Sequence, residues 1–208
     1  MGLHHPVLLI GVYGKAESGK DTIGNFLRER KGATKGAFAY TLKEVIGKQV
    51  LGLSDEQLYG SEKEFIDSRY NKSPRQLLQY IGTDVFRNMY EPIWVETEMR
   101  RFLSFKAEQE LLQAEFDGPI GLNPPTYVIC DVRFRNEMQA IKYNNGYMWK
   151  IVREDHHGAV SGIKGHASEI DMEGVPDSYF DLVIKAKTGE LDKIYSIVDK
   201  EYERITGV

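Results

Sequence analysis

A glycine-rich loop with an embedded lysine lies near the start of the chain, in the order Gly14-Lys15-Ala16-Glu17-Ser18-Gly19-Lys20-Asp21-Thr22. The loop follows an apolar run and precedes an amphipathic segment, which is the context of a phosphate-binding loop. The two glycines let the backbone curl so that successive N–H groups point at phosphate oxygens, and Lys20 is placed to reach the β- and γ-phosphates. The loop therefore predicts binding of a nucleoside triphosphate, and a glycine-rich turn that merely caps a helix is the alternative. The expected contacts to the nucleotide come from Gly14, Lys15, Ala16, Ser18, Gly19, Lys20, Asp21 and Thr22.

Three oxygen-bearing side chains are candidates for binding Mg²⁺. The usual pattern has a hydroxyl residue directly after the lysine, but Asp21 stands there and Thr22 follows, and a hard cation accepts either type of oxygen. Asp131 ends the apolar run 127–130, and a carboxylate at the carboxyl end of a parallel strand lies beside the phosphate loop. The alternative for Asp131 is an N-cap of the helix expected to start near Phe134, and both roles can coexist.

Basic residues outside the loop suit the transfer of a phosphoryl group. That reaction needs no covalent nucleophile from the protein, only two anions held in line with their charge neutralised. Arg133 follows an expected strand and is the candidate for offsetting the charge that builds during transfer, ahead of Arg153. The full set of cations expected at the site is Lys20, Lys43, Arg75, Arg87 and Arg133.

The composition limits the classes of function. The chain has 208 residues, 41% of them hydrophobic and 28% charged, which is typical of one α/β domain with a core. A formal net charge of −4 argues against a protein that mainly binds nucleic acid. No stretch has the apolar length needed to span a membrane, and the first residues lack the charged-then-apolar pattern of a signal peptide. The single cysteine, Cys130, excludes an internal disulfide, and together these features lead us to expect a cytoplasmic protein. Whether it forms a homodimer is left open.

The five histidines show no spacing typical of a metal site. The adjacent pair His156-His157 favours a solvated loop over a metal site, and Cys130 is expected to be buried in a strand.

Short apolar runs alternate with helical stripes, which predicts a mostly parallel sheet of about five strands covered by helices on both faces. We expect the strands at 7–13, 37–40, 127–130, 148–152 and 182–184. Helices are expected from Thr22 to about 32, at 42–50, from Ser73 onward, at 94–116, at 136–143, and at the end of the chain. Either Tyr147 or Trp149 is a candidate for stacking on a base, and the other for the core.

The middle of the chain predicts a helical insertion, about 54–117, within a single domain that spans 1–208. Its first part, 54–72, is polar and is expected to be mobile. Ser73 and Pro74 then form an N-cap and first turn. The expected buried positions are Leu77, Leu78, Ile81, Val85 and Met89 in that helix and Val95, Met99, Phe102 and Leu103 in the next. A glycine-containing segment, about 154–168, is expected to be a lid-like loop.

Five separated segments together resemble the bacteriophage deoxynucleoside monophosphate kinases. They are Gly14 to Thr22, Leu42-Lys43-Glu44, the run from Ser73-Pro74-Arg75 to Gly82-Thr83-Asp84, Asp131-Val132-Arg133-Phe134-Arg135-Asn136-Glu137, and His166-Ala167-Ser168-Glu169. The first segment alone is shared with other small-molecule kinases, but the ordered set is far more specific. The resemblance implies a P-loop NTPase three-layer fold and, for a phage-encoded chain, a place in the host cytoplasm.

The resemblance also implies transfer of the γ-phosphoryl group of ATP, with Mg²⁺, to a deoxynucleoside monophosphate, giving a diphosphate for DNA precursor synthesis. It places Lys43 and Arg75 at the monophosphate of the acceptor. Candidates that orient the acceptor are Gln79, Asp84, Arg87 and Glu169. Adenine binding near Thr188 is a further hypothesis.

Several alternatives stay open. Arg75 is otherwise a surface charge, and Arg87 otherwise pairs with Glu91 one turn later. A kinase for phosphomevalonate or dephospho-coenzyme A would keep the phosphate loop and change the acceptor pocket. A non-enzymatic nucleotide-dependent regulator is the third class, although the Asn-Lys-x-Asp guanine reader of a GTP switch is absent from the sequence.

Overall fold

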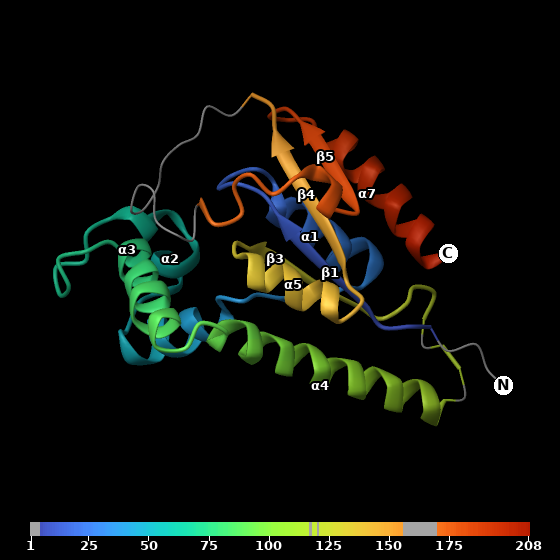
Figure 1. Ribbon diagram of the computed structural model, residues 1–208, viewed down its shortest axis with the longest axis horizontal. Helices are drawn as coiled ribbons and strands as arrows, with labels where there is room; N and C mark the ends of the chain where they lie inside the picture. Colours follow the sequence, from blue (N-terminus) through green and yellow to red (C-terminus); the bar gives the residue numbers. More distant parts are fainter. Residues whose placement is uncertain (1–4, 117, 120, 156–169) are drawn as a thin grey trace.

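A five-stranded parallel sheet forms the centre of the molecule (Figure 1). The computed structural model describes residues 5–116, 118–119, 121–155 and 170–208. The strands are β1 (Leu8–Tyr13), β2 (Thr34–Gly36), β3 (Thr126–Val132), β4 (Tyr147–Arg153) and β5 (Leu182–Ala186), in the order β2-β3-β1-β4-β5. Because all neighbours are parallel, the carboxyl ends of the strands meet at one edge, where ligands bind in sheets of this kind.

Helices cover both faces of the sheet and complete three layers (Figure 1). On one face, α1 (Lys20–Lys31) and α7 (Leu191–Thr206) pack on the side chains of Ile10, Val12 and Val128. On the other, α4 (Ile93–Glu115) and α5 (Arg135–Tyr143) pack on Leu9 and Ile129. The alternation of neighbouring strand residues between the two cores follows from the period of a β-strand. The predicted P-loop-type α/β architecture is confirmed.

The second strand lies earlier than predicted. We expected it at 37–40, but β2 is Thr34–Gly36 and the following residues form a turn. The backbone N–H groups of Ala37, Phe38 and Ala39 donate to side-chain carboxylates and not to a neighbouring strand. The strand ends where these carboxylates replace the ladder of backbone hydrogen bonds.

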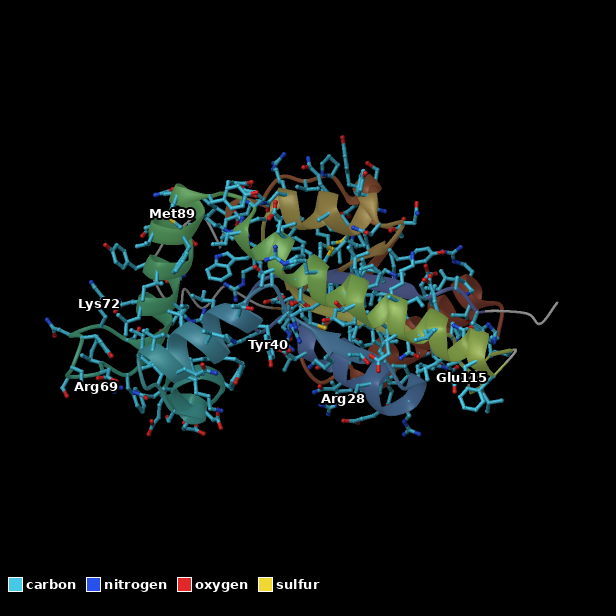
Figure 2. All side chains as sticks on the ribbon, turned by 90° about the horizontal axis from the view of Figure 1, so that it is seen from below. Arg28, Tyr40, Arg69, Lys72, Met89 and Glu115 are labelled. Atoms are coloured by element: carbon cyan, nitrogen blue, oxygen red, sulfur yellow. The ribbon has the colours of Figure 1, made fainter. Side chains whose placement is uncertain are left out.

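Five short helical segments between β2 and α4 form a unit that we call the helical arm, residues 42–87. They are the π-helix η1 (Leu42–Val50), α2 (Asp55–Tyr59), the 3-10 helix η2 (Ser61–Glu64), α3 (Pro74–Gln79) and the π-helix η3 (Tyr80–Arg87). The arm lies to one side of the sheet (Figure 1). Seen from below, Arg69 and Lys72 of the arm, and Met89 just beyond it, lie at the opposite end of the molecule from Glu115 at the end of α4 (Figure 2). The sequence analysis does not predict α2 and η2, although Ser54 and Gln57 form a capping box that marks the start of α2.

Three positions predicted to be buried are exposed. Val85 is 42% exposed, Met89 70% and Leu103 49%. The first two follow from the change to π-helix at Tyr80, where hydrogen bonds skip one more residue and the 3.6-residue spacing no longer marks one face. In η3 the buried residues are Gly82 and Arg87 instead. On α4, Val95, Met99 and Phe102 are buried as expected, and Leu103 lies beside their stripe.

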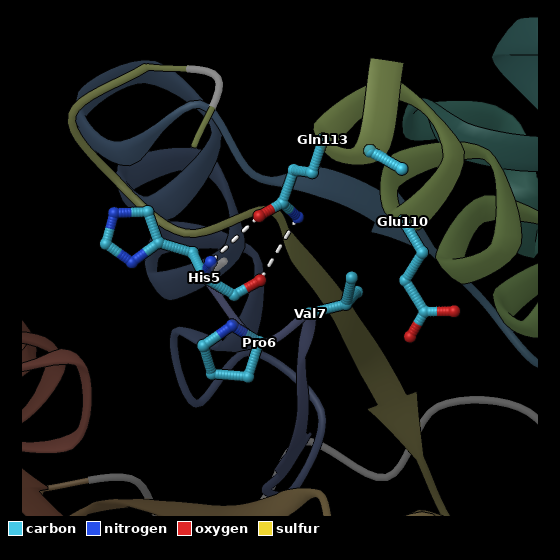
Figure 3. Close-up of a pocket in the computed structure, with 6 residues that line it drawn as sticks. His5, Pro6, Val7, Glu110 and Gln113 are labelled. Atoms are coloured by element: carbon cyan, nitrogen blue, oxygen red, sulfur yellow. Dashed lines mark hydrogen bonds between the residues drawn. The ribbon is translucent and has the colours of Figure 1, made fainter. Parts of the chain in front are cut away.

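A hollow of about 400 Å³ lies where the chain enters the sheet, beside the end of α4 (Figure 3). The buried amide of Gln113 holds the backbone of His5 there: its Oε1 accepts from the N–H at 2.8 Å and its Nε2 donates to the carbonyl at 3.1 Å. This hollow adjoins the amino end of β1, whereas the glycine-rich loop follows its carboxyl end. The hollow is therefore part of the N-terminal anchor and not of the phosphate site.

Cys130 is buried in β3, as predicted, and burial raises the pKa of its thiol to about 12. The thiolate is the reactive form, so we expect thiol reagents at pH 8 to label the native protein slowly and the denatured protein fast. Following incorporation of a thiol-specific dye with and without denaturant checks this, and the single cysteine makes the readout unambiguous. Equal labelling rates would contradict the buried position.

Among the described helices, none is both long and apolar enough to cross a membrane.

Candidate active site

The glycine-rich loop connects β1 to α1 at the carboxyl edge of the sheet. Glu17 and Gly19 have positive φ angles of 59° and 104°, and the N–H of Ser18 donates to the carbonyl of Lys15 at 3.2 Å. A Cβ atom at Gly14 would lie 2.4 Å from Ser18 Oγ and 2.7 Å from the carbonyl oxygen of Ile151. Glycine is therefore required at position 14, because the loop passes too close to β4 for any side chain.

Lys20 folds back across the loop that it terminates. Its Nζ donates to the carbonyl oxygens of Gly14 and Lys15, both at 2.6 Å. These bonds hold the ammonium against the loop, in reach of phosphate oxygens that the loop would bind.

A pocket of about 480 Å³ adjoins the loop. It is lined by the loop, by the end of β4 and by Met172, Glu173 and Gly174, and it includes the cations Lys15, Lys150 and Arg153. The hydroxyl of Ser18 is buried and has no hydrogen-bond partner within the described residues. A buried donor without a partner, in a pocket lined by cations, fits an anionic ligand.

Glu173 closes part of this pocket, because its carboxylate lies 2.8 Å from the ammonium of Lys15. Both side chains are about half exposed or more, so this ion pair is weak and can open for a ligand. Lys150 is held by Asp177 at 2.8 Å and lies over the ring of Phe180.

Asp131 connects β3 to the turn after β2. Its Oδ1 accepts from the N–H of Phe38 and its Oδ2 from the N–H of Ala39, both at 2.9 Å. The alternative that Asp131 caps the next helix is wrong: the N-cap of α5 is Phe134, and the carboxylate of Glu137 accepts its N–H. Each carboxylate oxygen keeps a further lone pair, so binding of Mg²⁺ by Asp131 stays a prediction.

Lys43 is surrounded by charges from three other segments of the chain, namely α1, η2 and the end of β3. Burial lowers the pKa of its ammonium, the carboxylates of Asp131 and Asp21 oppose that shift, and the cations Arg133 and Lys63 add to it. Its Nζ also lies 4.5 Å from the ring centroid of Tyr59. The structure thus brings four of the predicted site residues into one electrostatic cluster, namely Asp21, Lys43, Asp131 and Arg133.

The predicted metal ligands suit an ion that arrives with its nucleotide. Within the described part of the chain, no group of three or more histidine, cysteine or acidic side chains can hold a metal by itself. Asp21 is the first-turn acid of α1, its carboxylate is 87% exposed, and Lys35 Nζ lies 3.8 Å away. Mg²⁺ in phosphoryl-transfer sites commonly uses one or two carboxylates plus phosphate oxygens, which these residues can supply.

The predicted acceptor residues lie along one continuous helical run, α3 followed by η3. The hydroxyl of Ser73 caps this run and Pro74 begins it, as predicted. Arg75 Nε lies 2.6 Å from Glu64 Oε1, and its side chain is only 17% exposed, so the alternative of a surface charge is wrong. Gln79 is buried and Asp84 is exposed.

Arg87 is buried at the end of η3, where its guanidinium contacts the carboxylate of Glu137 and lies 3.7 Å from the ring centroid of Phe134. It reaches the backbone carbonyl of Glu91 at 3.5 Å and not its carboxylate, so the alternative that the two side chains pair is wrong. Burial raises the pKa of Glu137, and the charge of Arg87 opposes that shift. A direct contact of Arg87 with substrate stays a prediction.

The remaining predicted site residues lie in the turn after β5, in β4, or outside the described residues. Thr188 lies in the turn between β5 and α7, and its N–H donates to the carboxylate of Asp155 at 2.9 Å. Trp149 is fully buried in the core and Tyr147 packs against the same cluster. Glu169, the histidines at 156, 157 and 166, and residues 156–168 of the expected lid-like loop lie outside the described residues.

Two relatives named as kinases are similar to this chain in amino-acid sequence. A deoxynucleotide monophosphate kinase from Acanthamoeba polyphaga mimivirus is 34% identical over 200 residues, which cover 93% of this chain and 97% of the relative. The chain belongs to the deoxynucleotide monophosphate kinase family. A second member, from Escherichia phage RB69, is 27% identical over 129 residues, which cover 62% of this chain and 44% of that protein. No family model matches the chain.

Membership of this kinase family makes the chain a phosphotransferase enzyme. The family resemblance deduced from five short segments is confirmed at the level of the whole chain.

The sequence analysis missed Glu98 and Glu137, two buried carboxylates that hold backbone N–H groups near the site. Glu137 carried a signal, because an acidic residue three positions after a helix start is typical of a capping box. Glu98 carried none, since it lies in a helix rich in exposed charges.

Proposed function

We propose that this kinase transfers the γ-phosphoryl group of ATP to a deoxynucleoside monophosphate, giving a diphosphate for DNA precursor synthesis. The observation that carries the proposal is the glycine-rich loop with Lys20 beside the charged cluster around Lys43, at the carboxyl edge of a parallel sheet. The name of the mimivirus relative, which the chain matches over nearly its full length, supports the acceptor class.

On the donor side, the loop from Gly14 to Thr22 binds the phosphates through its N–H groups, and Lys20 meets the β- and γ-phosphates. Mg²⁺ bound with the nucleotide neutralises phosphate charge, and its proposed protein ligands are Asp21, Thr22 and Asp131. Thr188, in the turn after β5, is proposed to lie near the adenine.

On the acceptor side, Lys43 and Arg75 hold the monophosphate. Gln79, Asp84 and Glu169 orient the nucleoside, and Arg87 is the weakest candidate for direct contact because its guanidinium is already engaged by Glu137. An oxygen of the acceptor phosphate attacks the γ-phosphorus as the bond to the β-phosphate oxygen breaks. Arg133 offsets the charge that develops on the transferred group.

A coupled ADP-release assay with ATP and Mg²⁺ tests the proposal. The acceptors are dGMP, dTMP, dCMP, dAMP and their ribose counterparts, with phosphomevalonate and dephospho-coenzyme A as the two other acceptor classes. We expect turnover that depends on a deoxynucleoside monophosphate and stops when EDTA removes the metal. Turnover only with phosphomevalonate or dephospho-coenzyme A would replace the acceptor, and no turnover with any of them would overturn the proposal.

A further inference from the structure

A cluster of three side chains, of which Arg87 and Glu137 are buried, joins the two halves of the proposed site. Arg87 ends the helical arm, whereas Phe134 and Glu137 belong to the start of α5, about 50 positions further along the chain. The side chains of Arg87 and Glu137 are only 6% and 3% exposed. Removing two charges from water costs free energy, so such a pair is poor evidence for stability alone, and specification of a geometry is a better reason for its presence.

Glu137 fixes the backbone of the connection between β3 and α5. One of its carboxylate oxygens contacts the guanidinium of Arg87. The other accepts the N–H of Arg133 at 2.7 Å and that of Phe134 at 3.0 Å. A single carboxylate therefore sets the position of the residue whose side chain we propose to offset charge during transfer.

Residues at the start of α5 hold the guanidinium of Arg87 both at its edge and on its flat face. Its Nη1 donates to Asn136 Oδ1 at 3.2 Å, and its Cζ lies 3.7 Å from the ring centroid of Phe134. A guanidinium with several fixed partners has little freedom to rotate. Because Arg87 ends the helical run that carries Arg75, the cluster connects the acceptor side directly to the backbone of Arg133.

We propose that Arg87, Phe134 and Glu137 position Arg133 against the acceptor helix, and that none of the three contacts substrate. This inference rests on the proposed function. It assigns Arg87 to positioning, because the contacts of its guanidinium are directed at α5. Loss of the cluster then lowers kcat through Arg133, while binding of ATP by the loop after β1 is preserved.

A double-mutant cycle tests the coupling. Glu137→Gln is made alone and in an Arg133→Ala background, and kcat, the KM of the acceptor and the Kd of ATP are measured for all four proteins. We expect Glu137→Gln alone to lower kcat about tenfold with the Kd of ATP within about twofold, and to have little further effect once Arg133 is absent. Effects on kcat that multiply in the double variant would overturn the proposal.

The matched control is Glu201→Gln, which breaks a carboxylate pair with Arg204 on α7, away from the site, and is expected to leave kcat unchanged. Circular dichroism melting separates folding from positioning. A variant with a lower Tm, but with the kcat of the wild-type protein at temperatures well below that Tm, would show that the cluster has a merely structural role. If Glu137→Gln does not fold, Phe134→Leu keeps an apolar side chain and loses the aromatic face, and the same cycle is run with it. Absence of turnover in the wild-type protein would instead overturn the proposed function.

Discussion

Lys20→Ala is expected to reduce kcat about 1,000-fold, the largest effect of any single substitution at the site. The Lys20 ammonium lies 2.6 Å from two loop carbonyl oxygens, where a bound γ-phosphate would meet it. Its charge is matched to the phosphate oxygens that become more negative during transfer, and removal of such a group costs about 4 kcal/mol of transition-state stabilisation. Steady-state kinetics at saturating ATP, with the Kd of ATP measured separately, check the result.

The control for Lys20→Ala is Lys106→Ala, which removes a lysine from an exposed pair on α4. Lys20→Arg keeps the charge but replaces a compact ammonium by a planar fork, so we expect it to recover only part of the activity. A Lys20→Ala enzyme within threefold of wild-type kcat would remove Lys20 from the reaction, whatever its effect on the shape of the loop.

The sheet and the phosphate loop were predictable from the sequence because both depend on local patterns. Buried parallel strands appear as short apolar runs such as 127–130, and the loop carries its conformation in Gly14 and Gly19. The predicted boundaries of strands were wrong where a side chain distant in the sequence determines the end of the strand. The carboxylates of Glu98 and Asp131 end β2 by accepting hydrogen bonds from three consecutive backbone N–H groups. The sequence around β2 gives no sign of these contacts.

The helical arm was predictable only in part for a similar reason. The cap formed by Ser73 and Pro74 is local and was predicted, but the change to a π-helix at Tyr80 depends on packing and alters which residues are buried. In the site, residue types identified Lys43, Asp131 and Arg133, and the fold alone shows that they influence one another. The role of Glu137 could be recognised only from the sequence and the fold together. Its capping position is a local feature of the sequence, whereas its contact with Arg87 is visible only in the fold.

Arg75→Ala is expected to raise the KM of the deoxynucleoside monophosphate about 30- to 100-fold, with kcat changed less than about fivefold and the KM of ATP unchanged. The Arg75 side chain is 17% exposed near the start of α3, where the helix keeps its fork in one direction. Loss of a charge-assisted pair between arginine and phosphate costs about 2 to 3 kcal/mol, which corresponds to this change in affinity. Initial rates over a range of acceptor concentrations at fixed ATP measure it.

The contact between Arg75 and Glu64 supplies the decisive control. If Arg75 acted only by holding η2 through its 2.6 Å pair with Glu64, then Glu64→Gln would raise the KM of the acceptor as much as Arg75→Ala does. We expect Glu64→Gln to change that KM by less than about threefold, since it leaves the guanidinium in place and the pair is partly exposed to solvent. Arg100→Ala, on the exposed face of α4, controls for loss of a positive charge in general. Equal effects of Arg75→Ala and Glu64→Gln would assign Arg75 to the stability of the arm, and unchanged kinetics for Arg75→Ala with every acceptor would exclude it from the site.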